Sequence, residues 1–335
     1  MNDDLVFDSA RRLLADLTSP ATIRSAEQGQ FAQELWQAVE EAGFLEALGE
    51  TPGWAGIADA AAILRAGGAT TAPIPLAGGM LARRLMGRAG IHQASSDRPP
   101  GIVLAMTPRA LYGSTGVRWF WPHDTVGVIA CWPNGWALVK SGGSTAGRNY
   151  AGEPWWLVEN GADAPTLNPY PEGCSFDDCQ QFMAMSRAAL MAGAMVEVLK
   201  LTIEHANTRV QFGKPLGKQP AVQHQLALMA EQVAAAEVSV EYAVRRWAGD
   251  TAPEIIWRAV ATAKIRAGEA AGKVAEMAHQ IHGAIGFTRE YRLQDLTRRL
   301  WTWRDEAGAE SEWAHELGKR LIAGGADKLW PALTE

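Results

Sequence analysis

A short stretch near residue 210 offers a cation, an aromatic face and an accessible backbone. Arg209, Phe212 and Gly213 lie within the run Arg-Val-Gln-Phe-Gly-Lys-Pro-Leu, at the break between two expected long helices. An arginine presents a fork of donors suited to phosphate oxygens, and a glycine lets the backbone approach a ligand closely. A plain loop whose arginine caps a helix end fits the same residues, so the pattern alone leaves both interpretations open.

A second polar stretch follows where another long helix is expected to end in a glycine-rich turn. Gln280 and the backbone around Gly283 can hydrogen-bond a polar ligand, although a helix cap explains the glycine equally well. His279 and His282 are three residues apart, but no further ligands at recognisable spacing accompany them. We therefore expect no metal site here.

The composition is that of an ordinary globular protein and bounds the function. The chain has 335 residues, 47% of them hydrophobic, and a net charge of −6, which argues against nucleic acid as a partner. Its three cysteines lack CxxC spacing, which indicates free thiols rather than disulfides or zinc. The acidic start has no signal-peptide pattern, and no uninterrupted apolar run reaches ~18 residues. We expect a cytoplasmic protein with no membrane partner.

The pattern along the chain predicts three domains. Residues 1–95 are expected to form helices, residues 96–172 a small β domain, and residues 173–335 a helical bundle. Helical spacing of apolar residues is strongest over Phe31–Leu48, whereas the glycines and prolines of Gly67–Pro75 predict a loop. The expected fold class is therefore mainly α with a small β domain.

The middle and last parts carry different periodicities. Pro133-Asn134-Gly135 separates two strand-like runs and predicts a hairpin. Further on, apolar residues step by threes and fours in four successive stripes, which predicts a four-helix bundle. The strand-like runs are Gly101–Ala105, Val117–Trp121, Thr125–Trp132 and Trp136–Lys140, and the stripes begin at Met191, Val222, Ile256 and Leu293.

Both polar stretches resemble the C-terminal signatures of the acyl-CoA dehydrogenase family. The family pattern Arg-x-x-Phe-Gly-Lys-x-Leu with a later Gln is matched by Arg209, Phe212, Gly213, Lys214, Leu216 and Gln223. The pattern Gln-Ile-x-Gly-Gly-x-Gly-Phe is matched by Gln280, Ile281, Gly283, Gly286 and Phe287, with Ala284 in place of the second glycine. The order of the two signatures, after a β domain, is also that of the family.

The resemblance implies an activity and a cofactor. Members of the family use FAD for the α,β-dehydrogenation of an acyl-CoA thioester: a carboxylate takes the α-proton and the flavin takes the β-hydride. Two subunits share each flavin site, so Arg209, Phe212, Gln280 and Gly283 would hold the adenine-diphosphate part of a neighbour's FAD. An oligomer is implied, of identical or unlike subunits.

Two departures from the family pattern concern the flavin ring and the catalytic base. The ring-binding segment of the β domain is represented only by Met106–Pro108. Alignment places Ala307 at the usual base position, and Ser186, before Arg187, at the alternative one. Glu306 is the best remaining carboxylate and is our candidate catalytic base.

The short β domain and the Trp-x-Trp-Arg-Asp-Glu ending over residues 301–306 resemble a short subgroup of the family. The resemblance implies a role in fatty acid or steroid catabolism, in heterotetramers that hold two copies of each of two unlike subunits. The leading interpretation is an acyl-CoA dehydrogenase subunit. The alternatives are a catalytically degenerate subunit that completes a partner's FAD site, and a plain helical bundle without cofactor.

Overall fold

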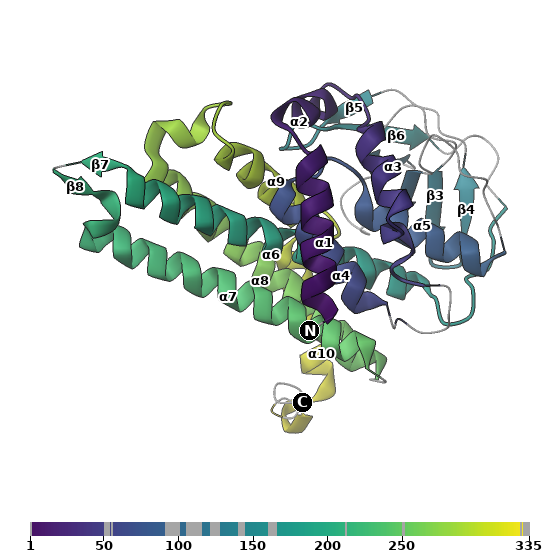
Figure 1. Ribbon diagram of the computed structural model, residues 1–335. Coiled ribbons are helices and arrows are strands. Elements are labelled where there is room, and N and C mark those ends of the chain that lie inside the picture. Colours follow the sequence, from purple (N-terminus) through teal and green to yellow (C-terminus); the bar gives the residue numbers. More distant parts are fainter. Residues whose placement is uncertain are drawn as a thin grey trace.

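The computed structural model is mainly helical, with the strands between residues 101 and 159 gathered on one side (Figure 1). This confirms the predicted fold class, while the predicted limits of the three domains stay predictions. The structure describes residues 2–49, 54, 56–90, 101–104, 116–120, 128–139, 145–159, 166–211, 213–249, 252–328 and 330.

The first part of the chain is helical because its apolar residues recur on one face of each helix. Leu14, Leu35, Trp36 and Val39 are all buried in the common core. The helices are α1 (Asn2–Leu17), α2 (Pro20–Glu27), α3 (Gln33–Glu41), the short η1 (Phe44–Glu46), α4 (Ile57–Thr70) and α5 (Leu76–Arg88).

The predicted loop at Gly67–Pro75 is wrong in its first half, because α4 continues to Thr70. The glycines are there for packing. A Cβ atom at Gly68 would lie 1.9 Å from the backbone oxygen of Leu190 on the crossing helix. The absence of a side chain therefore lets two helix backbones touch, and the glycines serve an interior contact rather than a turn.

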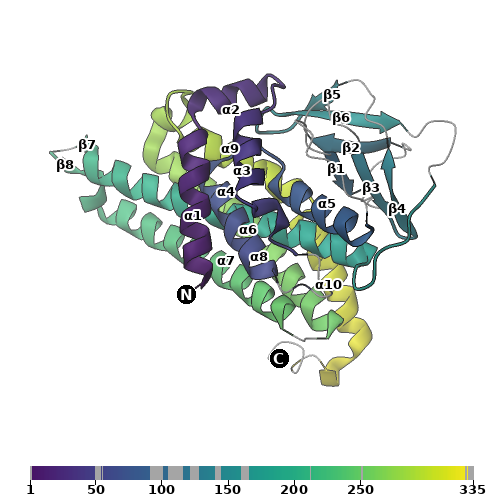
Figure 2. The ribbon, with the colours of Figure 1, turned by 45° about the vertical axis from the view of Figure 1, so that its right-hand side comes forward.

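The strands between residues 101 and 159 form two small three-stranded sheets, ordered β1-β3-β4 and β2-β6-β5 (Figure 2). The predicted hairpin is confirmed: β3 and β4 pair antiparallel across Pro133 and Asn134, and Gly135 takes a positive φ of 151°. The last two strands were not predicted, since β5 contains a glycine and β6 begins at a proline. The strands are β1 (Gly101–Leu104), β2 (Gly116–Phe120), β3 (Val128–Trp132), β4 (Gly135–Val139), β5 (Thr145–Arg148) and β6 (Pro154–Glu159).

The last part is a bundle of long helices. Helices α6, α7 and α8 pack against one another, and α9 packs against α6 and α8 (Figure 1). The predicted stripes fall on their buried faces, as at Val198, Val240, Val274 and Leu300. An additional helix, α10, packs on α8. The helices are α6 (Phe176–Thr208), α7 (Pro220–Ala248), α8 (Pro253–His282), η3 (Gly283–Phe287), α9 (Leu293–Asp305) and α10 (Glu310–Gly324).

Helix α6 combines length with an apolar composition. An 18-residue window within it has a mean hydropathy of 1.5, enough by length and composition to cross a membrane. Within the molecule, 72% of that window is buried. The hydropathy thus follows from its central place, where α4, α7, α8 and α9 surround it.

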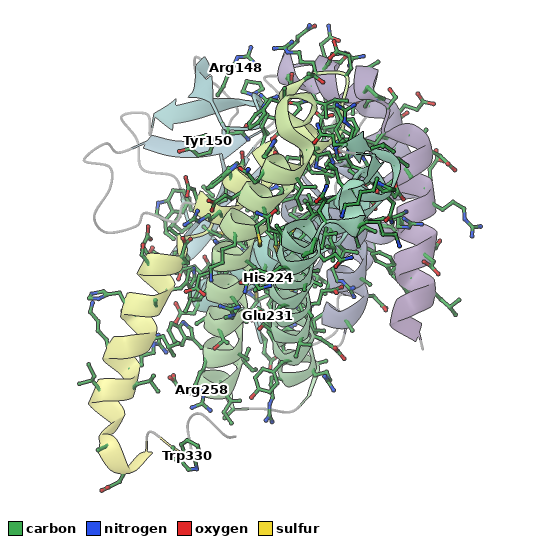
Figure 3. The ribbon with its side chains drawn as sticks, turned by 90° about the vertical axis from the view of Figure 1, so that its left-hand side faces the viewer. Arg148, Tyr150, His224, Glu231, Arg258 and Trp330 are labelled. Carbon is green, nitrogen blue, oxygen red and sulfur yellow. The ribbon has the colours of Figure 1, made fainter. Side chains whose placement is uncertain are left out.

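The turn between β5 and β6 fastens the strands to α9. The backbone N–H of Ala151 donates to the Thr302 hydroxyl at 3.1 Å. Arg299 donates to Glu153 at 2.7 Å, in an ion pair whose side chains are almost fully buried. Figure 3 shows Arg148, at the end of β5, and Tyr150, in the turn, at the opposite end of the molecule from Trp330. The strands therefore sit against the helix that leads into the candidate base.

Candidate functional site

The C-terminal end of α6 presents Arg209. This residue caps the helix in an extended conformation, with its N–H donating to the His205 carbonyl at 2.9 Å. A hairpin of two short strands, β7 (Val210–Gln211) and β8 (Lys214–Pro215), follows directly. The Arg209 side chain is exposed and forms no ion pair with a described residue, so its donors are available to a ligand. The predicted partner Phe212 lies outside the described residues.

The end of α8 presents Gln280 and a turn that only glycine adopts readily. Gly283 has φ 64° and ψ −146°, a conformation that side chains disfavour. A Cβ atom placed there would meet nothing within 4 Å, so the backbone faces open space. Gln280 is exposed one turn earlier. Both residues therefore lie at the end of α8, on a surface that a ligand can reach.

A histidine stack holds these two helix ends side by side. The rings of His205 on α6 and His282 on α8 lie 4.4 Å apart, tilted by 22°. His282 Nδ1 donates to the Ala278 carbonyl at 2.8 Å, which leaves Nε2 to accept from the Tyr291 hydroxyl at 3.2 Å. Burial lowers the pKa of His282 to about 4, so the stack is neutral at pH 7. The sequence did not reveal this contact, since neither histidine belongs to a signature position.

An open cavity of about 1200 Å³ lies beside this end of α8. Gln280 and Gly283 line it, whereas Arg209 and Glu306 do not. Its wall includes Phe287 and Trp301, whose side chains are partly exposed and can stack against a flat ring. The remaining lining residues are Glu269, Gly272, Lys273, Ala275, Glu276, His279, Ala284, Gln294, Thr297, Arg298, Arg304 and Glu310.

The candidate base Glu306 is engaged in an ion pair. Its Oε2 accepts from Arg187 Nε at 2.6 Å, and both side chains are 15% exposed. Burial raises the pKa of Glu306, and the Arg187 charge offsets part of that rise. The contact joins the two regions from which the family takes its base, since Arg187 follows the alternative position at Ser186. Only a carboxylate released from Arg187 would be free to take a proton.

The loop after Glu306 is held by a buried lysine that the sequence analysis missed. Lys264 Nζ donates to the carbonyls of Arg304 and Gly308, at 2.7 and 2.6 Å. Between them, Ala307 takes a φ of 57°, which is uncommon for a residue other than glycine. Lys264 lies four residues after Val260 on the apolar stripe of α8. The sequence could have revealed Lys264 as a buried lysine with partners, because it lies on an apolar stripe where a lysine is unusual.

Replacing Lys264 by methionine should destabilise the protein by about 2 kcal/mol. The variant keeps the length of the side chain but leaves the two carbonyls without a donor. Removal of the desolvation cost of the buried ammonium offsets part of the lost hydrogen-bond energy. Chemical unfolding of the two proteins measures the difference. Lys273→Met, on the exposed side of the same helix, should leave stability unchanged. Equal stabilities for both variants would show that Lys264 does not hold the loop.

The described residues fit one end of an FAD molecule. The free fork of Arg209, the exposed amide of Gln280 and the open backbone at Gly283 are suited to a pyrophosphate. The predicted ring-binding remnant Met106–Pro108 lies outside the described residues. No group of His, Cys, Asp and Glu among the described residues is arranged to hold a metal ion.

Comparisons with known proteins agree with the signatures. Residues 176–311 match the family model for the acyl-CoA dehydrogenase C-terminal domain. Acyl-CoA dehydrogenase IpdE2 of Mycolicibacterium smegmatis is 27% identical, over 88% of this chain and 91% of that protein. A 3-sulfinopropanoyl-CoA desulfinase of Paraburkholderia xenovorans is 38% identical over 117 residues, which cover 34% of this chain but only 29% of that protein.

Solved structures show the same fold along nearly the whole chain. One chain of the ChsE4-ChsE5 complex from Mycobacterium tuberculosis superposes with a TM-score of 0.77 at 20% identity, covering 96% of this chain and 97% of that one. PigA with FAD and proline gives a TM-score of 0.74 at 16% identity, covering 97% and 98%. Residues 176–311 therefore carry the acyl-CoA dehydrogenase C-terminal domain, and the chain as a whole has the fold of these solved relatives.

Proposed function

We propose that this chain is one subunit of an FAD-dependent acyl-CoA dehydrogenase, which introduces an α,β double bond into an acyl-CoA thioester. The observation that carries the proposal is the pair of helix ends at Arg209 and Gly283, held side by side by the His205–His282 stack and open to a ligand. Bound FAD would accept the hydride. Arg209, Gln280 and Gly283 would hold its pyrophosphate from the neighbouring subunit.

We further propose that the working form is a cytoplasmic oligomer with an unlike acyl-CoA dehydrogenase subunit. One comparison supports the unlike partner, because ChsE4-ChsE5 is a complex of two differently named chains. Another supports the cofactor, because PigA was solved with FAD. The similarity to IpdE2 along most of the chain is to another acyl-CoA dehydrogenase. The substrate class, an acyl-CoA of the fatty acid or steroid type, belongs to the same proposal.

The visible spectrum of the purified protein tests the cofactor. We expect flavin absorbance when the chain is produced with its unlike subunit, together with an oligomer in light scattering. The chain produced alone should retain less flavin, because each site needs two subunits. Absence of flavin and a monomeric mass in both preparations would refute the proposal.

Flavin retention should depend on Arg209. Arg209→Ala removes a charge-assisted, two-pronged contact, so the dissociation constant for FAD should rise by about tenfold to a hundredfold. Arg209→Lys should recover only part of this affinity, since an ammonium does not reproduce the fork. Arg258→Ala is the control and should bind FAD normally, because Arg258 lies on α8 but does not line the cavity (Figure 3). Equal FAD titrations for all four proteins would contradict the assignment.

A second candidate function is a subunit that completes a partner's FAD site without catalysing the reaction. Ala307 at the usual base position and the engagement of Glu306 by Arg187 favour it. In that case the partner supplies the carboxylate. Under either proposed function, the isolated chain should be a poor dehydrogenase of straight-chain acyl-CoA thioesters.

Glu306→Gln distinguishes the two functions. If Glu306 is the base, the complex that carries the variant should reduce a dye with acyl-CoA about a hundredfold more slowly, because proton removal loses its acceptor. The FAD content should stay the same, which separates a lost base from a lost cofactor. An unchanged rate in the complex would assign the base to the partner and support the second function.

A further inference from the structure

The three cysteines of the chain meet at one place, although Cys131 lies more than forty residues before the other two. Cys131 lies on β3, Cys174 in the loop that leads to α6, and Cys179 in the first turns of α6. All three thiols are free and buried. The Sγ atoms of Cys174 and Cys179 lie 3.9 Å apart, and Cys131 is within hydrogen-bonding reach of Cys179. The proposed flavin reaction uses none of them.

The cap of α6 brings Cys174 and Cys179 together. Ser175 is the N-cap, and its hydroxyl accepts from the Asp178 N–H at 3.1 Å. The Asp178 carboxylate accepts from the Ser175 N–H at 2.9 Å, which completes a capping box. In such a cap, the residue before the N-cap packs on the fourth helical residue, a contact usually made by two apolar side chains. Here both positions carry thiols.

The surroundings shift the pKa values of the two thiols in opposite directions. The hydrogen bond from Cys179 and the nearby charge of Arg84 lower the pKa of Cys174, whereas its contacts and burial raise the pKa of Cys179. A thiolate beside a thiol is the arrangement that oxidants attack. Cys174 is also one residue from solvent on either side, because Gly173 and Ser175 are exposed.

We propose that Cys174 and Cys179 are a modification site: a redox-active dithiol that a peroxide converts into a disulfide across the cap of α6. The Cys174 thiolate attacks one peroxide oxygen, the O–O bond breaks, and a sulfenic acid and hydroxide form. The Cys179 sulfur then attacks the Cys174 sulfur, and the S–O bond breaks. Together the two thiols lose two electrons and two protons. The peroxide takes up both and is reduced to two water molecules.

The geometry requires only a local change. The sulfurs must approach by about 2 Å, since a disulfide bond is about 2.05 Å long. The capping box holds both backbones near each other, so side-chain rotation supplies most of the approach. The disulfide would fasten the loop from the strands to the first bundle helix. It would also withdraw the Cys179 sulfur from its contact with Cys131.

Hydrogen peroxide treatment of the purified chain, followed by thiol alkylation, intact mass and peptide mapping, tests the proposal without any need for flavin. The wild type should lose two of its three thiols, regain them with dithiothreitol, and yield a peptide that joins Cys174 to Cys179. Cys131→Ala should lose both of its thiols at the same rate. Cys174→Ala should lose thiols at least tenfold more slowly.

Three outcomes would overturn the proposal. They are full retention of the wild-type thiols, a Cys131–Cys179 bond as the main product, and irreversible oxidation of Cys174 without a disulfide. Circular dichroism of each variant before treatment checks that it is folded. If Cys131→Ala does not fold, the peptide map of the wild type alone still separates these outcomes.

Discussion

Gly68→Ala is expected to destabilise the protein by about 3 kcal/mol, although alanine is the better helix former. The new Cβ atom would lie 1.9 Å from the backbone oxygen of Leu190 and 2.7 Å from its carbonyl carbon. Backbone atoms on α6 cannot rotate away as a side chain would, so α4 and α6 must separate. Gly193 on α6 makes the reciprocal contact, with Arg65 O 1.9 Å from its ideal Cβ position.

Gly318→Ala is the matched control for this prediction. Gly318 also lies inside a helix, α10, but a Cβ atom there would meet nothing within 4 Å. That variant should gain up to about 1 kcal/mol from helix propensity alone. Urea unfolding of both variants gives the comparison. If Gly68→Ala proved as stable as Gly318→Ala, the close crossing of α4 and α6 would be wrong.

The same crossing shows where the sequence was misleading. Gly67 and Gly68 read as loop residues because a single sequence does not distinguish a glycine needed for a turn from one needed for contact. The distinction depends on Leu190, more than a hundred residues away. Periodicity over long helices was a safer guide, since many residues repeat the same signal: most residues of the predicted stripes of α7 and α8 are buried.

In the candidate site, too, local sequence patterns picked out some residues and could not reveal a contact between distant ones. Arg209, Gln280 and Gly283 are candidates because each belongs to a contiguous signature. The structure places all three at accessible helix ends, and their role in binding stays a prediction. The ion pair of Glu306 with Arg187 was not, because it joins side chains 119 positions apart. Local spacing identifies which functional groups a segment carries. Which residue pairs with a buried charge depends instead on how distant helices pack.

The stability of the protein should fall in mild acid because of His282. Its pKa in the native state is lowered to about 4, against an ordinary 6.5, chiefly by burial. Above pH 6.5 the ring is neutral in both the native and the unfolded state, and it contributes no pH dependence. Between 6.5 and 4 the unfolded state takes up a proton that the native state refuses, so stability decreases as the pH falls. The total is about 3 kcal/mol at pH 4.

The surroundings of His282 reinforce this expectation. The stacked His205 and the neighbouring His279 also have pKa values lowered by burial, and each positive charge disfavours the next. Arg209, four residues after His205, adds a fixed positive charge close to the stack. Within the described part of the chain, the one titratable group bonded to the ring is the Tyr291 hydroxyl, which stays neutral in this range. Among the described residues bonded to the ring, none is a carboxylate that would stabilise a protonated His282.

His282→Phe isolates the contribution of this ring. The variant keeps an aromatic ring against His205 but cannot be protonated, so the stability advantage of the wild type over the variant should shrink by about 3 kcal/mol between pH 7 and pH 4. Other titrating groups cancel in that difference. Tyr291→Phe is the control, since it removes the hydroxyl on Nε2 and leaves the imidazole, and it should retain the wild-type pH dependence. Urea unfolding at several pH values supplies the measurement, and a pH-independent difference between wild type and His282→Phe would show that the stack does not keep His282 neutral.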